Sequence, residues 1–534
     1  MNIRIELNKL KRNAFKWSYK SECYFSGYLF GDNGEFLQGE NAIDFIIAQA
    51  DLKTYLKTSN GVFSLVYKKD DSLFIFSDKS RFIPVFYSFI KNEFVVSDNF
   101  DFLLSESENP IIDNIAKYQF LVSSFTFNDR TLIEGIKQVQ AGELVSFTRD
   151  EIKCEILYRF SKSPNEMQKV DDQLFSKAEK SFKIIGKHLA DSLQGRPVLL
   201  PLSGGFDSRL IACWLKSEGV ENVTCYTFGR KGYYEIDVSR KVAESLGYKW
   251  YYVEYNEEVV KDFLKDEIFH ELYRFLAQGT SMFFMQDYFS VKKLFADGIV
   301  DESYIVIPGH ASGALAGSLL NKTVPAENKI VGFEDVVIAN YAHQLKHKKA
   351  DHKMLQKEIE KSLPVAASTN FPDYAKMEDW VCRERISKYI FNSGRIFSFY
   401  NMECRFPFWD NEFADFFLSL PVEQRLYKKL YDKVCEEAYF KKMGVYFGDW
   451  QNITSRKFEI QKIKNKIRPY LPQVVKQYYN RKNDWQFYNQ STQYFLDELK
   501  TKKWKFTDNG SNYLYRILNW YLLKITETIE ELRK

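Results

Sequence analysis

The spacing of hydrophobic and polar residues divides the chain into two halves with different predicted structure. Up to about residue 165, short alternating or apolar runs recur at 24–30, 62–67 and 73–76. Turn residues separate these runs, which is typical of strands. The second and third runs flank Asp70, so we predict a hairpin there. We expect the first half to form a layered sheet domain.

After residue 170 the pattern alternates between helices and strands. Apolar residues at three- and four-residue spacing from Leu174 to Leu193 predict an amphipathic helix. The next predicted elements are strands at 196–202, 223–228, 250–253 and 304–307, with helices at 207–216 and 235–246. This alternation predicts a parallel sheet with helices on both faces, and such sheets bind ligands at the carboxyl ends of their strands. From about residue 325 the chain is predicted to be mostly helical, with a final helix near 513–532.

Composition excludes several classes of protein. A chain of 534 residues is too long for a single small binding module, and its net charge of +4 is too low for a dedicated nucleic-acid binder. No two of its 7 cysteines have CxxC spacing, which argues against a disulfide framework or a structural zinc site. The start of the chain lacks the apolar core of a signal peptide, and no run of 18 apolar residues occurs. We therefore expect a soluble, cytoplasmic protein with no membrane or nucleic-acid partner.

The motif with the most chemical content is Ser-Gly-Gly-Phe-Asp-Ser, between a predicted strand and a predicted helix. Gly204 and Gly205 lack Cβ atoms, so their backbone N–H groups can approach an anion closely. The start of the following helix adds unpaired donors and a positive dipole. Ser203 and Ser208 offer hydroxyl groups to phosphate oxygens, and Asp207 can hold Mg²⁺. The sequence is neither a Walker A loop nor a GxGxxG fingerprint, yet it predicts a pyrophosphate-binding loop.

This motif resembles the signature of the PP-loop ATP pyrophosphatases, and within them that of asparagine synthetase and its relatives, including β-lactam synthetase. The resemblance extends over nearly the whole chain and is strongest at 195–255 and 395–425. In the second half, the similar stretches are 225–229, Glu235, 242–247, 405–410, 418–421 and 456–458. In the first half, they are 60–64, 78–87 and 139–142.

The resemblance implies a two-domain α/β enzyme. Residues 1–165 would form an Ntn-type sheet domain like that of class II amidotransferases, and residues 166–534 a parallel α/β PP-loop domain with a helical extension. The second domain would use ATP and Mg²⁺ to adenylate a carboxylate, and ammonia or an amine would then displace AMP. The implied site residues are Ser203, Gly204, Gly205, Asp207 and Ser208 for pyrophosphate, Asp207 for the metal, and Phe228 and Gly309 beside the nucleoside.

The first half departs from the family at its nucleophile. Glutamine hydrolysis in this family needs a cysteine that becomes residue one after Met removal, but here the chain begins Met1-Asn2, and an amide is no nucleophile. The family's glutamine-holding motifs are not recognisable between residues 25 and 60. Cys23 would become N-terminal only after unusual processing, and it is more simply a buried structural thiol. We expect this domain not to hydrolyse glutamine, as in β-lactam synthetase.

The second half departs at a phosphate-side loop. Family members carry an acidic pair there, whereas residues 308–318 contain no carboxylate. His310 in this loop would suit an anionic substrate or general acid–base catalysis, or it has no role. Lys457 would balance negative charge that develops during catalysis, or it is simply solvated. Glu235 and Asp237 are explained equally well as helix N-terminal caps.

These observations favour an amide-forming ligase that acts on a small-molecule carboxylate with ammonia or an amine, without its own glutamine hydrolysis. The alternative is a catalytically impaired, nucleotide-binding pseudoenzyme with a regulatory role, because the acidic loop is missing. Nucleic-acid modification has no supporting basic patch. The sequence names neither substrate and leaves the oligomeric state open, with a homodimer among the options.

Overall fold

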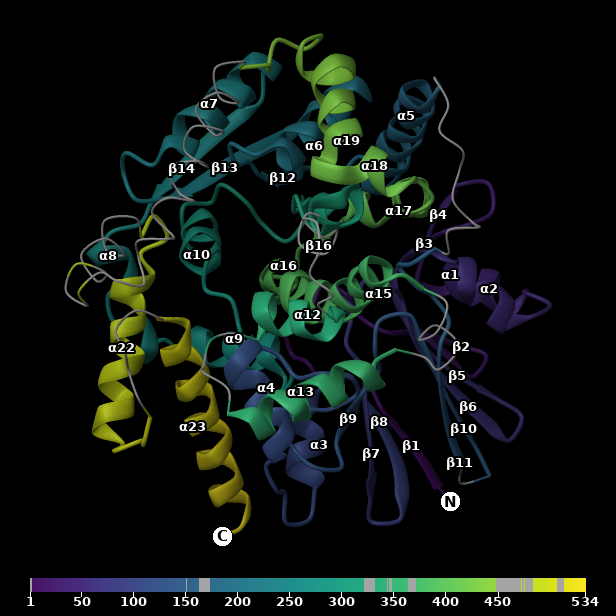
Figure 1. Cartoon of the computed structure of the whole chain (residues 1–534), viewed down its shortest axis with the longest axis vertical. Helices are drawn as coiled ribbons and strands as arrows, with labels where there is room; N and C mark the ends of the chain where they lie inside the picture. The colour runs from purple at the N-terminus through teal and green to yellow at the C-terminus, as the bar shows by residue number, and fades with distance from the viewer. Residues whose placement is uncertain are drawn as a thin grey trace.

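The protein is a mixed α/β molecule, seen here in a computed structural model (Figure 1). The structure describes residues 2–149, 151–162, 173–320, 332–342, 344, 348–363, 371–447, 472, 475, 484–506 and 513–534. Within these residues the strands form three sheets, two in the first half and one parallel sheet in the second.

The two sheets of the first half pack against each other. One has the order β11-β10-β6-β5-β3-β2 with β4 beside β3, and the other has the order β1-β8-β7-β9. Phe94 of β8 stacks on Phe147 of β10, with 4.3 Å between ring centroids, so the apolar faces of the sheets meet. The predicted hairpin is confirmed, because β5 pairs antiparallel with β6 and Asp70 lies in the turn between them. The strands are β1 Asn2–Glu6, β2 Ser18–Lys20, β3 Cys23–Phe30, β4 Phe36–Gln38, β5 Asn60–Lys69, β6 Ser72–Ser77, β7 Phe86–Ile90, β8 Glu93–Ser97, β9 Lys137–Gln138, β10 Glu143–Thr148 and β11 Glu151–Ile156.

The second half contains the parallel sheet that the alternating pattern predicted. Its order is β14-β13-β12-β15-β16. Strands after β12 are added first on one side of it and then, from β15, on the other, so the strand order reverses between β12 and β15. Ligands of such sheets bind in the crevice outside the carboxyl ends of the strands at this switch point. The strands are β12 Val198–Pro201, β13 Val223–Gly229, β14 Lys249–Glu254, β15 Ile305–Val306 and β16 Glu403–Cys404, and the first helices are α5 Leu174–Leu193, α6 Phe206–Ser217 and α7 Tyr234–Leu246.

The remaining described residues are mostly helical, as predicted. Strand β16 is an exception that sequence periodicity could not indicate, because a strand of two residues shows no alternation. No helix of the described residues is long and apolar enough to cross a membrane. The helices not yet named are α1 Gly39–Ile47, α2 Leu52–Thr58, α3 Phe100–Glu106, α4 Asn114–Ser123, α8 Glu257–Val260, η2 Phe263–Lys265, α9 Glu267–Ala277, α10 Tyr288–Ala296, η3 Ala314–Ser318, α12 Phe333–Tyr341, α13 Lys349–Lys361, α15 Asp373–Trp380, η4 Val381–Ile390, α16 Phe391–Phe399, η5 Pro407–Trp409, α17 Asn411–Leu418, α18 Val422–Arg425, η6 Leu426–Lys428, α19 Lys429–Val434, η7 Cys435–Phe440, α22 Tyr488–Thr501 and α23 Leu514–Leu532.

Buried polar contacts join the two halves. Lys388 of η4 donates to the carbonyl oxygen of Asn128 at 2.6 Å, and Glu384 accepts the Asn128 N–H at 3.1 Å. Phe82 of the first half packs edge-on against Phe406 of the second, at 4.8 Å between centroids. The predicted domain boundary at residue 165 lies outside the described residues and stays a prediction.

Candidate active site

The loop between β12 and α6 is held in shape by its own hydroxyl groups. The Ser203 N–H donates to Ser208 Oγ at 3.1 Å, and the Gly205 N–H donates to Ser203 Oγ at 3.1 Å. No side chain caps the N-terminus of α6. The unpaired N–H groups of a first helical turn therefore point outward at the carboxyl end of β12, which is the arrangement that binds phosphate.

Two glycines let neighbouring segments approach this loop closely. A Cβ atom on Gly204 would lie 3.2 Å from Glu235 Cγ, and one on Gly309 would lie 3.2 Å from the backbone nitrogen of Ser208. The structure thus brings Gly309 to the predicted phosphate site. Glu235 accepts a hydrogen bond from the Gly204 N–H at 3.4 Å, so its carboxylate faces the loop rather than only its own helix.

Asp207 is oriented by a residue that the sequence analysis missed. The Tyr431 hydroxyl, on the buried face of α19, donates to Asp207 Oδ1 at 2.9 Å. The second carboxylate oxygen of Asp207 has no hydrogen-bond partner among the described residues. One free carboxylate oxygen next to a phosphate site suits Mg²⁺, which takes one or two carboxylates and completes its shell with phosphate oxygens and water.

A second missed residue supplies positive charge at the same place. The Lys428 ammonium lies 5.9 Å from the ring centroid of Phe206, the first residue of α6, and 3.2 Å from Asp432 Oδ1. Tyr427 and Lys428 both have left-handed backbones, with φ of 60° and 58°. Two such residues in a row are costly unless the surrounding structure holds them in place. The sequence signal that could have found Lys428 is its position shortly after the family-like stretch at 418–421.

The loop at 308–318 carries no carboxylate, and its backbone is strained. Ala311 has φ of +102°, which side chains rarely adopt. His310 Nε2 lies 3.0 Å from Ser393 Oγ. Burial lowers the pKa of His310 to about 4, so the ring is neutral at pH 7 and would not attract an anionic substrate by charge. Its catalytic role stays a prediction, and Lys457 lies outside the described residues.

Aromatic residues line the carboxyl end of the neighbouring strand β13. Phe228 is half-buried and stacks on Tyr255, with 5.0 Å between centroids. The Tyr226 hydroxyl donates to Asp287 Oδ1 at 2.7 Å, and burial raises the pKa of Asp287 to about 6. A flat aromatic face beside the phosphate loop is compatible with the predicted contact between Phe228 and a nucleoside.

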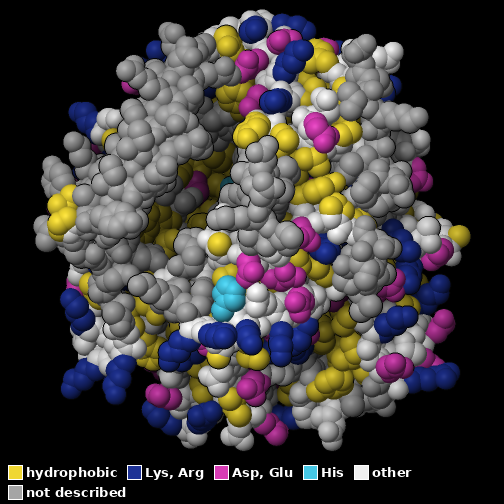
Figure 2. Space-filling view, in the orientation of Figure 1, with side chains coloured by type: hydrophobic (Ala, Val, Ile, Leu, Met, Phe, Trp, Pro, Cys, Tyr) yellow, Lys and Arg dark blue, Asp and Glu magenta, His cyan; other side chains and the backbone are white. Residues whose placement is uncertain are grey.

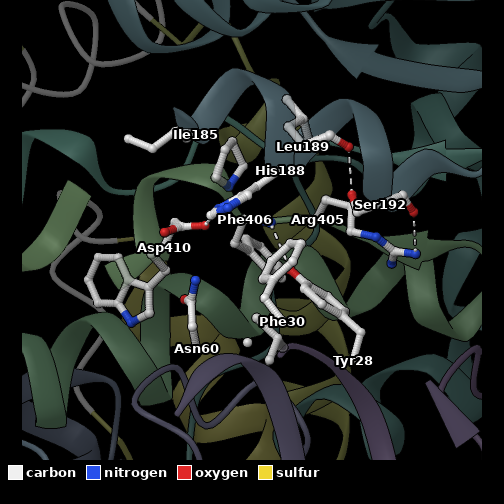
Figure 3. Close-up of a pocket in the computed structure, with 14 residues that line it drawn as sticks. Tyr28, Phe30, Asn60, Ile185, His188, Leu189, Ser192, Arg405, Phe406 and Asp410 are labelled. Carbon is white, nitrogen blue, oxygen red and sulfur yellow. Dashed lines mark hydrogen bonds and ion pairs between the residues drawn. The ribbon is translucent and has the colours of Figure 1, made fainter. Parts of the chain in front are cut away.

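The family-like segment at 405–410 serves as a joint between the halves. It lines a cavity of about 20 Å³, enough for one water molecule, between β3, β5 and α5 (Figure 3). His188 Nδ1 lies 2.8 Å from Asp410 Oδ2, and the His188 ring stacks on Phe30 at 4.9 Å. The Arg405 guanidinium lies 4.5 Å from the Tyr28 ring centroid. Through these contacts the first half packs against the segment that follows strand β16 of the parallel sheet.

Comparison with known proteins agrees with this geometry. Residues 189–438 match the family model described as asparagine synthase, a stretch that includes the 203–208 and 308–318 loops. This stretch, a little under half of the chain, is therefore similar to asparagine-synthetase-like PP-loop proteins. The solved NH3-dependent NAD synthetase from Campylobacter jejuni subsp. jejuni NCTC 11168, in complex with the nitrate ion, is 14% identical over 42% of this chain and 96% of its own, with a TM-score of 0.21, and we base no conclusion on it. No curated protein matches the chain.

Proposed function

We propose that the chain is an ATP-dependent ligase that adenylates a small carboxylate and transfers ammonia or an amine to it. The observation that carries this proposal is the uncapped start of α6 at the carboxyl end of β12, with Asp207 and two serine hydroxyls beside it.

In the first step, a carboxylate oxygen of the substrate attacks the α-phosphorus of ATP. The bond between the α-phosphorus and the bridging oxygen breaks, and pyrophosphate leaves. The N–H groups of the first turn of α6 would bind the charge that builds up on pyrophosphate, and the Lys428 ammonium would add to that stabilisation. Mg²⁺ held by Asp207 would neutralise phosphate charge when bound.

In the second step, the amine attacks the acyl carbon, AMP leaves, and the amine loses a proton. We propose free ammonia or a substrate amine as the nucleophile, because the thiol of Cys23 is not available for glutamine hydrolysis. Cys23 lies fully buried at the start of β3, and burial raises its pKa to about 12. Release of glutamate from glutamine by the purified protein would contradict this part of the proposal.

The test of the ligase is pyrophosphate–ATP exchange with Mg²⁺ across a panel of carboxylates that begins with aspartate. We expect exchange that depends on one acid and disappears in Asp207→Ala. The matched control is Asp71→Ala, which removes an exposed carboxylate from the turn after β5 and should leave exchange unchanged. Exchange that persists in Asp207→Ala would overturn the assignment of the site.

The regulatory pseudoenzyme is the second candidate, and the 308–318 loop without any carboxylate favours it. It predicts that calorimetry detects ATP binding while no acid in the panel supports exchange. Under the ligase proposal, the same calorimetry shows binding and the exchange assay shows turnover, so the two measurements together separate the candidates.

A further inference from the structure

A cavity of about 490 Å³ lies between the first half and the end of α13. Its lining residues are far in sequence from the 203–208 loop. Its walls come from the segment after α4, from β10 and β11, and from residues 358–362. Figure 2 shows basic side chains gathered along α13. No residue of the 203–208 loop lines the cavity, so it is a separate feature.

Most charged groups in the cavity wall already have partners of opposite charge. Arg130 forms ion pairs with Asp113 at 2.6 Å and with Glu358 at 3.1 Å, and Lys361 pairs with Glu358 at 2.6 Å. Asp129 pairs with Lys137 at 3.2 Å. These pairs stabilise the wall and leave little charge for a ligand.

Two charged residues in the wall form no ion pair among the described residues. Arg159 has no ion pair or hydrogen bond among the described residues. Glu143 is 2% exposed and accepts hydrogen bonds only from the backbone and side-chain nitrogens of Gln140, at 2.7 and 3.1 Å. The cavity therefore presents one guanidinium and one buried carboxyl group that form no ion pair, and the charges of Lys388 and Arg81 act on the Glu143 carboxyl group from further away. A ligand that carries both charges would give each of these two side chains an ion-pair partner.

We propose that this cavity binds a free α-amino acid as its zwitterion. Arg159 would bind the carboxylate through two N–H donors, and Glu143 would accept from the ammonium group. The volume lies in the range of small-molecule sites. A ligand with only one charge would leave either Arg159 or Glu143 unpaired. Because the cavity lies between the first half and α13, the amino acid would contact both.

Cys154 gives a local readout of occupancy. It is an exposed cysteine in the cavity wall, whereas the other six cysteines are buried. We would follow its labelling by a maleimide at pH 8 with and without each of the common amino acids. Burial raises the pKa of Cys154 to about 11, so labelling is slow enough to time by mass spectrometry. We expect one amino acid or a small group of them to slow labelling about tenfold, the slowing that occupancy of roughly nine-tenths of the sites would give.

Variants connect the protection to the two unpaired groups. Arg159→Gln should remove the protection and leave the labelling rate without ligand unchanged. Glu143→Gln should also remove the protection but speed labelling without ligand, because the Glu143 charge contributes to the raised pKa of Cys154. Arg149→Gln and Glu151→Gln are matched controls, because they change exposed residues of the same hairpin outside the cavity and should keep the protection. Arg159 has no partner to lose, so its variant remains informative if Glu143→Gln is unstable.

Three results would overturn the proposal: no amino acid slows labelling, acetate with methylammonium protects equally well, or protection survives in Arg159→Gln. Asp207→Ala should retain the protection, because it acts at the phosphate loop. Loss of exchange with retained protection would therefore separate failure of the ligase proposal from failure of this one.

Discussion

At the residue scale, the Tyr431 hydroxyl fixes the direction of the Asp207 carboxylate. Tyr431→Phe removes a hydrogen bond to a charged group, which costs roughly 1.5–3 kcal/mol. We expect the free energy of unfolding to fall by about that amount in urea denaturation, and pyrophosphate–ATP exchange to fall about tenfold. Tyr400→Phe is the control, since the buried Tyr400 hydroxyl has no hydrogen-bond partner among the residues that the structure describes. Equal losses in both variants would show that the Asp207 contact has no special role.

Among the described residues, Lys428 is the cation that we expect to stabilise pyrophosphate. Its ammonium lies beside the first residue of α6 and contacts Asp432 across one helical turn. Lys428→Met should lower exchange about 10²-fold, the usual effect of removing one group that stabilises developing charge. Lys429→Met, at the next position, is the control. A change in the Michaelis constant for ATP alone, with an unchanged maximal rate, would indicate a role in binding only.

At the scale of single elements, η4 carries a buried ion pair into the interface between the halves. Lys388 and Glu384 are both fully buried, 2.6 Å apart, and both also bond to the backbone of Asn128. Lys388→Met leaves the buried Glu384 carboxylate without its ion-pair partner, which costs about 3–5 kcal/mol. We expect a clear drop in the melting temperature, whereas Lys353→Met on the exposed face of α13 should change the stability by less than about 0.5 kcal/mol. If Lys388→Met leaves the melting temperature unchanged, water reaches this interface.

Much of the element structure could be predicted from the sequence, because local patterns set it. The helix over 174–193, the hairpin at Asp70 and the strand before the 203–208 loop all carry periodic apolar residues or turn chemistry. Strand β16 could not be predicted, because its two residues pair only through tertiary contacts with β15. Tyr431 was missed for the same reason: it meets Asp207 across 224 positions of sequence.

The candidate site was predicted in part, and its electrostatics were not. The Ser-Gly-Gly-Phe-Asp-Ser motif is local, so its loop and the nearby Gly309 were found from sequence. The neutral state of His310 depends on burial among Phe391 and Phe406, which are distant in sequence. The sequence suggested His310 for charge recognition, and only the surroundings in the fold show why its ring is uncharged at pH 7.

At the scale of the whole molecule, the joint between the halves makes stability depend on pH. Burial alone would lower the pKa of His188, but the hydrogen bond to Asp410 and the charge of that carboxylate outweigh burial and raise the pKa above its ordinary value. The charges of Glu412 and Asp191 act in the same direction. The folded state therefore holds the His188 proton more tightly than the unfolded chain does.

The sign of the pH effect follows from this shift. The His188–Asp410 contact contributes its full stabilisation below the unfolded pKa of about 6.5 and loses it as pH rises through the higher folded pKa. Buried Asp78 and Glu143, whose pKa values burial raises to about 7, also reduce stability as pH rises towards 7. The contribution of His188 is therefore obtained as the difference in the free energy of unfolding between the unchanged protein and His188→Gln at each pH. We expect His188→Gln to lower the free energy of unfolding more at pH 6 than at pH 8.5, measured by urea denaturation. His352→Gln, which removes a histidine that lies 2.8 Å from Asp335, is the comparison variant measured at the same two pH values. A loss in His188→Gln that is constant with pH would mean that the imidazole joins the halves by packing on Phe30 rather than by charge.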